Sequence, residues 1–155
     1  MRTRCFACTA LFLLSICQTA IAQPPFSIPD RARGADRIVV AQVSNVTASY
    51  ETNQYGDRLI VSHVDLAVEE TLKGGAAQSV TVDVPGGTLG GMILEVSHMP
   101  KLDRGERAVV FVKQNTAGRN VPYLADQGVL KLDSNNRVKG TDLDLDAVRQ
   151  MVAGR

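Results

Sequence analysis

Apolar and polar residues alternate with a period of two along much of this chain, and this pattern predicts β-strands. The segment RIVVAQVSNVTASYE (37–51) is rich in β-branched residues and places Val39, Ala41 and Val43 on one side of an extended backbone. The next segment, TNQYGD (52–57), carries the Asn, Gly and Asp residues of a hairpin loop. We therefore expect a second strand to follow this loop.

That second strand, RLIVSHVDLAVEETLKG (58–74), has an apolar and a polar face. Its apolar face carries Ile60, Val64, Leu66 and Val68 together with Ser62, and its polar face carries His63, Asp65 and Glu69. A strand of this length must bend or coil. A helix over 64–72 is the alternative, because Glu-Glu-Thr-Leu-Lys tolerates either state.

Two more alternating segments flank the glycine-rich stretch VPGGTLGGM (84–92). In SVTVDVP (79–85) the valines lie on the buried side, and the polar residues, among them Asp83, lie on the solvent side. In MILEVSHM (92–99) the alternation begins with Met92 on the buried side. We predict a strand on each side of the glycines.

The last third of the chain predicts two strands and a helix. AVVFVK (108–113) is apolar on both faces, which is typical of a central strand covered on both sides. GVLKL (128–132) predicts a further strand, and TDLDLDAVRQMVA (141–153) has apolar residues at helical spacing. Short strands, Gly-rich turns and few aromatic residues together indicate an all-β barrel or sandwich of five to six strands with a short C-terminal helix.

The N-terminus has the pattern of a secretory signal peptide over residues 1–22. Basic residues precede a short apolar run, and Ala20 and Ala22 form a small-residue cleavage site before Gln23. The apolar run is shorter than the roughly 20 residues that cross a bilayer, so we expect no membrane span. The protein is therefore expected to be exported, to the periplasm or the extracellular medium, and to begin at Gln23.

Cleavage at this site removes all three cysteines, Cys5, Cys8 and Cys17. The mature chain then has no thiol for a disulfide, a nucleophile or a metal site, and 133 residues must fold on the strength of their core. A lipidated N-terminus at Cys17 is the alternative, because Leu-Ser-Ile-Cys is similar to a lipobox. Ile16 departs from that pattern, in which the residue before the cysteine is small.

The mature chain is expected to form a single domain over 35–153, preceded by an irregular leader (23–34) that contains three prolines. Loss of two N-terminal arginines leaves 15 basic and 16 acidic residues, and the chain contains no Trp. This balance offers no basic groove with stacking aromatics, so we expect no nucleic acid partner. We expect a monomer.

Several segments together resemble a group of secreted bacterial domains: ADRIVVAQVSNV, VEETLKGG, VTVDVPGG and LDRGERAVVFVK. This group is similar in outline to the OB-like barrel of tissue inhibitors of metalloproteinases and other netrin-like modules. The resemblance covers residues 35–132, and it is most specific at Pro85-Gly86-Gly87 and at the Gly105-Glu106-Arg107 turn before Phe111. It implies an OB-like Greek-key barrel and, because related domains accompany matrixin-like zinc peptidases, a role in binding a partner.

The chain departs from that family at the residue on which inhibition depends. Tissue inhibitors chelate the protease zinc through a disulfide-anchored N-terminal cysteine, and no cysteine follows Ala22 here. The inhibitory mechanism therefore does not carry over, and an inhibitory role would rest on fold analogy alone.

The glycine-rich stretch does not match a phosphate-binding motif. A P-loop needs a Lys after its last glycine and a helix behind it, whereas Met92 and a predicted strand follow here. Gly86-Gly87-Thr88-Leu89-Gly90-Gly91 also lacks the Gly-x-Gly of a dinucleotide site. We interpret the glycines as a turn or bulge with positive φ angles and expect no cofactor.

Catalytic candidates are few. His63 and Asp65 lie two residues apart, so on a strand they share a face and could act as a metal pair or as a base with its orienting group, with His98 as a third member. The serines considered as nucleophiles, Ser62, Ser79 and Ser97, lie outside any Gly-x-Ser-x-Gly elbow.

The sequence therefore favours an exported, non-catalytic module that binds a protein or carbohydrate at the cell envelope. A small metal-dependent hydrolase that uses His63, Asp65 and His98 is the alternative, and a purely structural envelope protein is a third hypothesis.

Overall fold

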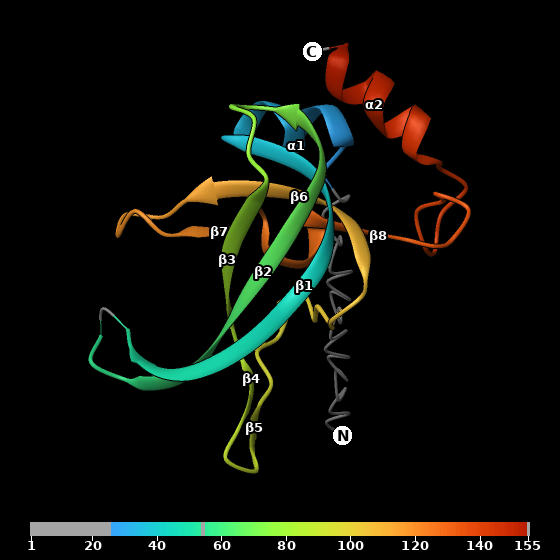
Figure 1. Ribbon diagram of the computed structural model, residues 1–155. Helices are drawn as coiled ribbons and strands as arrows, with labels where there is room; N and C mark the ends of the chain where they lie inside the picture. Colours follow the sequence, from blue (N-terminus) through green and yellow to red (C-terminus); the bar gives the residue numbers. More distant parts are fainter. Residues whose placement is uncertain (1–25, 54, 155) are drawn as a thin grey trace, which may run out of the picture.

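A computed structural model describes residues 26–53 and 55–154, and its centre is a single antiparallel sheet of six strands (Figure 1). The strands are β1 (Arg37–Thr52), β2 (Arg58–Lys73), β3 (Ser79–Pro85), β6 (Arg107–Gln114), β7 (Asn120–Pro122) and β8 (Val129–Leu132). Their order is β3-β2-β1-β6, and β7 and β8 pair one after the other with the remaining edge of β6. The five strands predicted from 37–51, 58–74, 79–85, 108–113 and 128–132 are thus confirmed.

The long hairpin of β1 and β2 dominates the sheet, and it is bent. Its register shifts at three places between Ile38 and Asn45, and such bulges increase the bend and twist of a strand. The predicted bend of a strand this long is therefore present. The alternative of a helix over 64–72 is wrong, because β2 continues as a paired strand to Lys73.

The sheet curls until its two outer strands approach each other, but it does not close. Asn120 at the start of β7 donates a side-chain hydrogen bond to the carbonyl oxygen of Thr81 in β3, at 3.2 Å. Within the described residues no ladder of backbone hydrogen bonds joins these strands. The prediction of a mostly β fold with a C-terminal helix is confirmed, whereas a closed barrel is not formed. One reason is that β7 is only three residues long and makes its backbone hydrogen bonds to β6 rather than to β3.

The core has two halves, one on each face of the central strands. Ile38, Val40, Val109 and Phe111 face the helices, whereas Val39, Ala41, Val43 and Val110 face the concave side of the sheet. Both faces of β6 are therefore buried, as its uninterrupted apolar sequence predicts.

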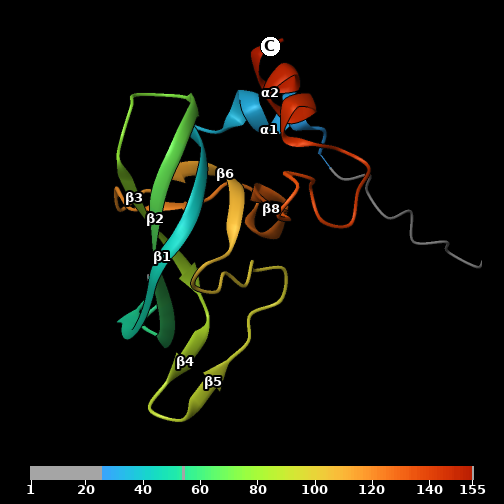
Figure 2. The same ribbon diagram turned by 45° about the vertical axis from the view of Figure 1, so that its right-hand side comes forward.

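Two helices cover the first of these faces and lie side by side (Figure 2). The helix α2 (Leu145–Ala153) confirms the predicted C-terminal helix. The carboxylate of Asp144 caps it by accepting a hydrogen bond from the backbone N–H of Ala147, at 2.8 Å, and Val148 and Val152 are buried beneath it.

The interpretation of 23–34 as an irregular leader is wrong for its second half. Residues Ile28–Gly34 form α1, which Ser27 caps and in which proline occupies the first turn, where it needs no N–H partner. Ile28 and Ala32 lie one helical turn apart and are buried in the core. A helix this short has only these two buried residues, and two positions are too few to show helical periodicity in the sequence.

The strand predicted over 92–99 is also largely wrong. Residues Met92–Leu94 form β5, which pairs only with β4 (Gly87–Leu89) in a separate two-stranded hairpin. This hairpin projects from the sheet, so Met92 is exposed rather than buried (Figure 1). A short 3-10 helix, η1 (Ala125–Gly128), and β7 are further elements that the sequence did not predict.

The predictions for the N-terminus lie outside the described residues: the signal peptide over 1–22, cleavage between Ala22 and Gln23, and the alternative of a lipidated Cys17. In the part of the chain that is described, no helix has both the length and the apolar character needed to span a membrane.

Candidate functional site

Exposed apolar side chains gather at the end of the molecule that is remote from the helices. Among the described residues, the large hydrophobic side chains with substantial exposure are Phe26, Tyr50, Tyr55, Met92 and Ile93. All but Phe26 belong to the tip of the β1–β2 hairpin or to the β4–β5 hairpin, which project at the same end in both views (Figures 1 and 2).

Tyr50 and Met92 bring these two hairpins into contact. The hydroxyl of Tyr50 donates a hydrogen bond to Sδ of Met92 at 3.6 Å, and the guanidinium of Arg58 lies 4.1 Å above the centre of the Tyr50 ring. Ile93 is 71% exposed and Tyr55 is 79% exposed. We call Tyr50, Tyr55, Met92 and Ile93 the apolar tip.

A groove of about 800 Å³ begins beside the apolar tip. Side chains of the concave face of β1, β2 and β3 line one side, among them Val46 and Val64, and the segment 93–103 lines the other. Glu95, Lys101 and Asp103 lie along the groove, so it carries both signs of charge.

The first half of the glycine-rich stretch, residues 84–88, also lines this groove. Gly86, Gly87, Gly90 and Gly91 all have positive φ, which confirms the predicted turn. The hydroxyl of Ser62 donates a hydrogen bond to the carbonyl oxygen of Gly86 at 2.7 Å, and a Cβ atom at Gly87 would lie 2.2 Å from that hydroxyl oxygen. Glycine is therefore required at 87 both for its φ angle and for this close approach to β2.

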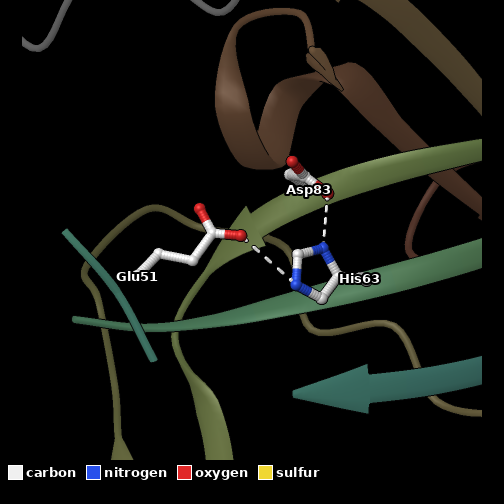
Figure 3. Close-up of side chains that lie close together, drawn as sticks. All are labelled: Glu51, His63 and Asp83. Atoms are coloured by element: carbon white, nitrogen blue, oxygen red, sulfur yellow. Dashed lines mark hydrogen bonds and ion pairs between the residues drawn. The ribbon is translucent and has the colours of Figure 1, made fainter. Parts of the chain in front are cut away.

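A second group of side chains lies on the opposite, convex face of the same strands. His63 of β2 is flanked by Glu51 of β1 and Asp83 of β3 (Figure 3). Its Nδ1 lies 2.8 Å from Oδ1 of Asp83, and its Nε2 lies 2.9 Å from Oγ of Ser49 and 3.3 Å from Oε1 of Glu51.

Arg119, from the loop before β7, completes this cluster. Its Nη1 lies 3.1 Å from Oδ2 of Asp83 and also contacts Oε2 of Glu51, and this pairing with Glu51 raises the pKa of the guanidinium. Asp83 lies on the face opposite to the buried valines, as predicted, but it is only 9% exposed rather than solvated, because His63 and Arg119 cover it. We call Ser49, Glu51, His63, Asp83 and Arg119 the His63 cluster.

The structure does not assemble the predicted set of His63, Asp65 and His98. Asp65 accepts hydrogen bonds from Thr81 Oγ1 at 2.7 Å and from Asn45 Nδ2 at 3.4 Å. His98 lies in the loop after β5 with a φ of 61°, is exposed, and is bonded through its carbonyl oxygen to the N–H of Asp126. His63 is thus the one member of the set in the cluster.

Sequence reasoning missed the partners of His63 because they come from strand pairing. Asp83 lies directly opposite His63 across the β2–β3 ladder, and Thr47 lies opposite it across the β1–β2 ladder. Ser49 and Glu51 are two and four residues from Thr47, which places them on the same face. Counting residue pairs back from the loop of the β1–β2 hairpin would have identified Ser49 and Glu51 as neighbours of His63.

The cluster resembles a metal site in composition but not in arrangement. Ligand atoms of Glu51, His63 and Asp83 all lie within 4.8 Å of one another, and in the described residues no other group of three His, Cys, Asp or Glu side chains does so. However, the imidazole lies between the carboxylates and uses a different nitrogen for each, whereas an ion binds a single ring nitrogen. Arg119 already forms an ion pair with each of the two acids.

Comparison with known proteins finds no family model that matches this chain and no matching curated protein. The functional argument therefore rests on the groove, the apolar tip and the His63 cluster.

Proposed function

We propose that this protein is an exported binding module that engages a partner protein at the cell envelope through its apolar tip and the adjoining groove, and that this end of the molecule has a binding role rather than a catalytic one. The observation that carries the proposal is the concentration of exposed apolar side chains at one end: Tyr50, Tyr55, Met92 and Ile93. Exposed apolar groups that gather beside a groove are typical of interaction sites.

The chemistry of this end favours a protein over the other ligands considered. The groove carries both signs of charge, which suits the mixed surface of a protein rather than a polyanion. Stacking on a sugar would rest on the Tyr55 ring, since Arg58 already covers one face of Tyr50 and neither Met92 nor Ile93 offers a ring. The flexible Met92 and the branched Ile93 are suited to packing against an apolar patch on a partner.

The proposal retains the OB-like interpretation of the fold. The curled sheet and the approach of β7 to β3 support it, and the concave face of that sheet forms one side of the groove. Export is also part of the proposal, and it rests on the N-terminal sequence pattern of a signal peptide.

Affinity purification from the envelope fraction of the producing cells tests the proposal. The tagged exported protein is compared with Ile93→Asp, which places a charge on the apolar tip, and with Ser134→Asp, which adds the same charge at an exposed turn after β8. We expect the same partner to co-purify with the wild type and Ser134→Asp, and its yield to fall at least about tenfold with Ile93→Asp, which corresponds to about 1.4 kcal/mol.

All three proteins must first show the same melting temperature. A lower yield of the partner can then be assigned to the changed surface rather than to unfolding. Retention of the partner by Ile93→Asp at wild-type yield would refute the role of the apolar tip. Absence of any partner from the wild type would refute the binding module itself.

A further inference from the structure

We propose that Ser49, His63 and Asp83 form an acyl-transfer site, in which the Ser49 hydroxyl is the nucleophile that attacks small carboxylic esters. The site is separate from the apolar tip, because it lies on the convex face of the sheet whereas the groove lies on the concave face. It uses none of the serines that the sequence singled out.

The hydrogen-bond geometry assigns a role to each of the three side chains. Asp83 as a carboxylate can only accept, so the proton between it and His63 resides on Nδ1. In the neutral ring, Nε2 is then the acceptor, and the Ser49 hydroxyl donates to it at 2.9 Å. Nucleophile, general base and orienting carboxylate are therefore connected in sequence, at the distances that a serine triad requires.

The burial of the three residues fits these roles. Asp83 is nearly buried and is held on its other oxygen by Arg119, so it can fix the orientation of the imidazole. The side chain of His63 is 27% exposed, and Ser49 is half-buried, so a ligand can reach both. All three belong to paired strands rather than to loops, which keeps their relative positions fixed.

The reaction balances without a metal or a redox partner. The Oγ of Ser49 forms a bond to the carbonyl carbon of the ester while its proton passes to Nε2 of His63, and the alkoxide leaves with that proton as the alcohol. Water then attacks the acyl-serine by the same route, releases the carboxylic acid and restores Ser49. Asp83 and Glu51 stabilise the imidazolium that forms in each half, because both carboxylates contact the ring.

Arg119 places a positive charge beside this site. Its Nη1 contacts the two carboxylates, and a guanidinium has further N–H donors that can face the oxygen of the substrate carbonyl. The site is separate from both the groove and the smaller hollow beside Arg104 and Asp133, since none of its residues lines either of them in the described structure. We assign it small acyl groups such as acetyl.

Covalent labelling with a fluorophosphonate probe tests this site. The probe transfers its phosphonyl group to an activated serine, with loss of fluoride and of the hydroxyl proton. Intact mass spectrometry and peptide mapping of the wild type are expected to show one adduct per chain, on Ser49. Labelling should be absent in Ser49→Ala, and at least about a hundredfold slower in His63→Gln, since a general base contributes about 10²–10⁴-fold.

Ser44→Ala is the matched control. Ser44 lies on the same strand and donates to the carbonyl oxygen of Asp65, so its removal is expected to leave both the adduct and the hydrolysis of p-nitrophenyl acetate unchanged. Ile93→Asp should also label normally. Absence of a Ser49 adduct in the folded wild type would overturn the proposal, and so would an adduct that forms equally fast in His63→Gln.

Discussion

At the scale of single residues, Gly87 shows how one position fixes the geometry of the candidate binding site. Its φ is 131°, and a Cβ atom there would collide with the hydroxyl of Ser62 on β2. That hydroxyl holds the neighbouring carbonyl of Gly86, so the collision would disturb the wall of the groove as well as the turn.

We therefore predict that Gly87→Ala lowers the free energy of unfolding by more than the roughly 1 kcal/mol that a strained φ alone costs. Gly75→Ala is the control, because Gly75 has no positive φ and a Cβ atom there would meet no described atom within 4 Å. Urea denaturation of both variants measures the difference. If the two variants are equally stable, the close approach of Gly87 to Ser62 does not require glycine at position 87.

The sequence predicted the backbone role of these glycines and singled out His63, but it did not predict the partners of His63 in the cluster. Glycine pairs between strands indicate positive φ angles by themselves, because the requirement is local. The association of His63 with Ser49 and Asp83 depends on the register of two ladders, so it is found by counting residue pairs across strands rather than along the chain. Simple spacing along the chain pointed to Asp65 instead, which shares the strand with His63 but is bonded to Thr81.

At the scale of elements, an ion pair connects two strands that are not neighbours. Arg107 of β6 reaches past β1 to Glu69 of β2, and its Nε and Nη2 lie 2.9 and 2.7 Å from the two carboxylate oxygens. The hydrogen bonds from Arg107 hold the pKa of Glu69 below its usual value near 4.5. A carboxyl group with a lowered folded pKa stabilises the fold above that usual value, and its contribution is lost as the pH falls through the folded pKa.

We predict that Glu69→Gln reduces stability at pH 7 by no more than about 1 kcal/mol, because the pair is partly exposed and screened by water. The difference from the wild type should shrink as the pH falls below 4.5. Urea denaturation at pH 7, 5 and 3 measures it, with Glu95→Gln at an exposed carboxyl as the control. A difference that grows on acidification would contradict the assigned direction of the pKa shift.

Elements that carry many patterned residues were predicted correctly, whereas short elements were predicted only in part: the four-residue strand β8 was predicted, but α1 and β7 were not. The long strands β1 and β2 and the apolar β6 carry enough residues for their faces to be read from the sequence. The short helix α1 shows only two buried positions, and the three-residue strands β4 and β5 pair away from the core. Met92–Leu94 has the alternation of a half-buried strand, but the turn at Gly90 and Gly91 directs it into solvent.

At the scale of the whole molecule, the faces of the sheet have different roles. The helices cover one side of the central strands, and the His63 cluster occupies the convex face of the β1–β2–β3 region. The concave face lines the groove, which opens beside the apolar tip. This arrangement leaves Met92 and Ile93 free to contact a partner while the helices stabilise the opposite end.

Site-specific photocrosslinking in the producing cells tests the binding role of the apolar tip most directly. A photoreactive amino acid replaces Ile93, Tyr55 or, as the control, Ser134, all of which are exposed. We predict that illumination gives the same discrete adduct from positions 93 and 55, none from 134, and a weaker adduct when unlabelled wild-type protein is co-produced in excess. Adducts from position 134 alone, or none from either tip position, would contradict the account.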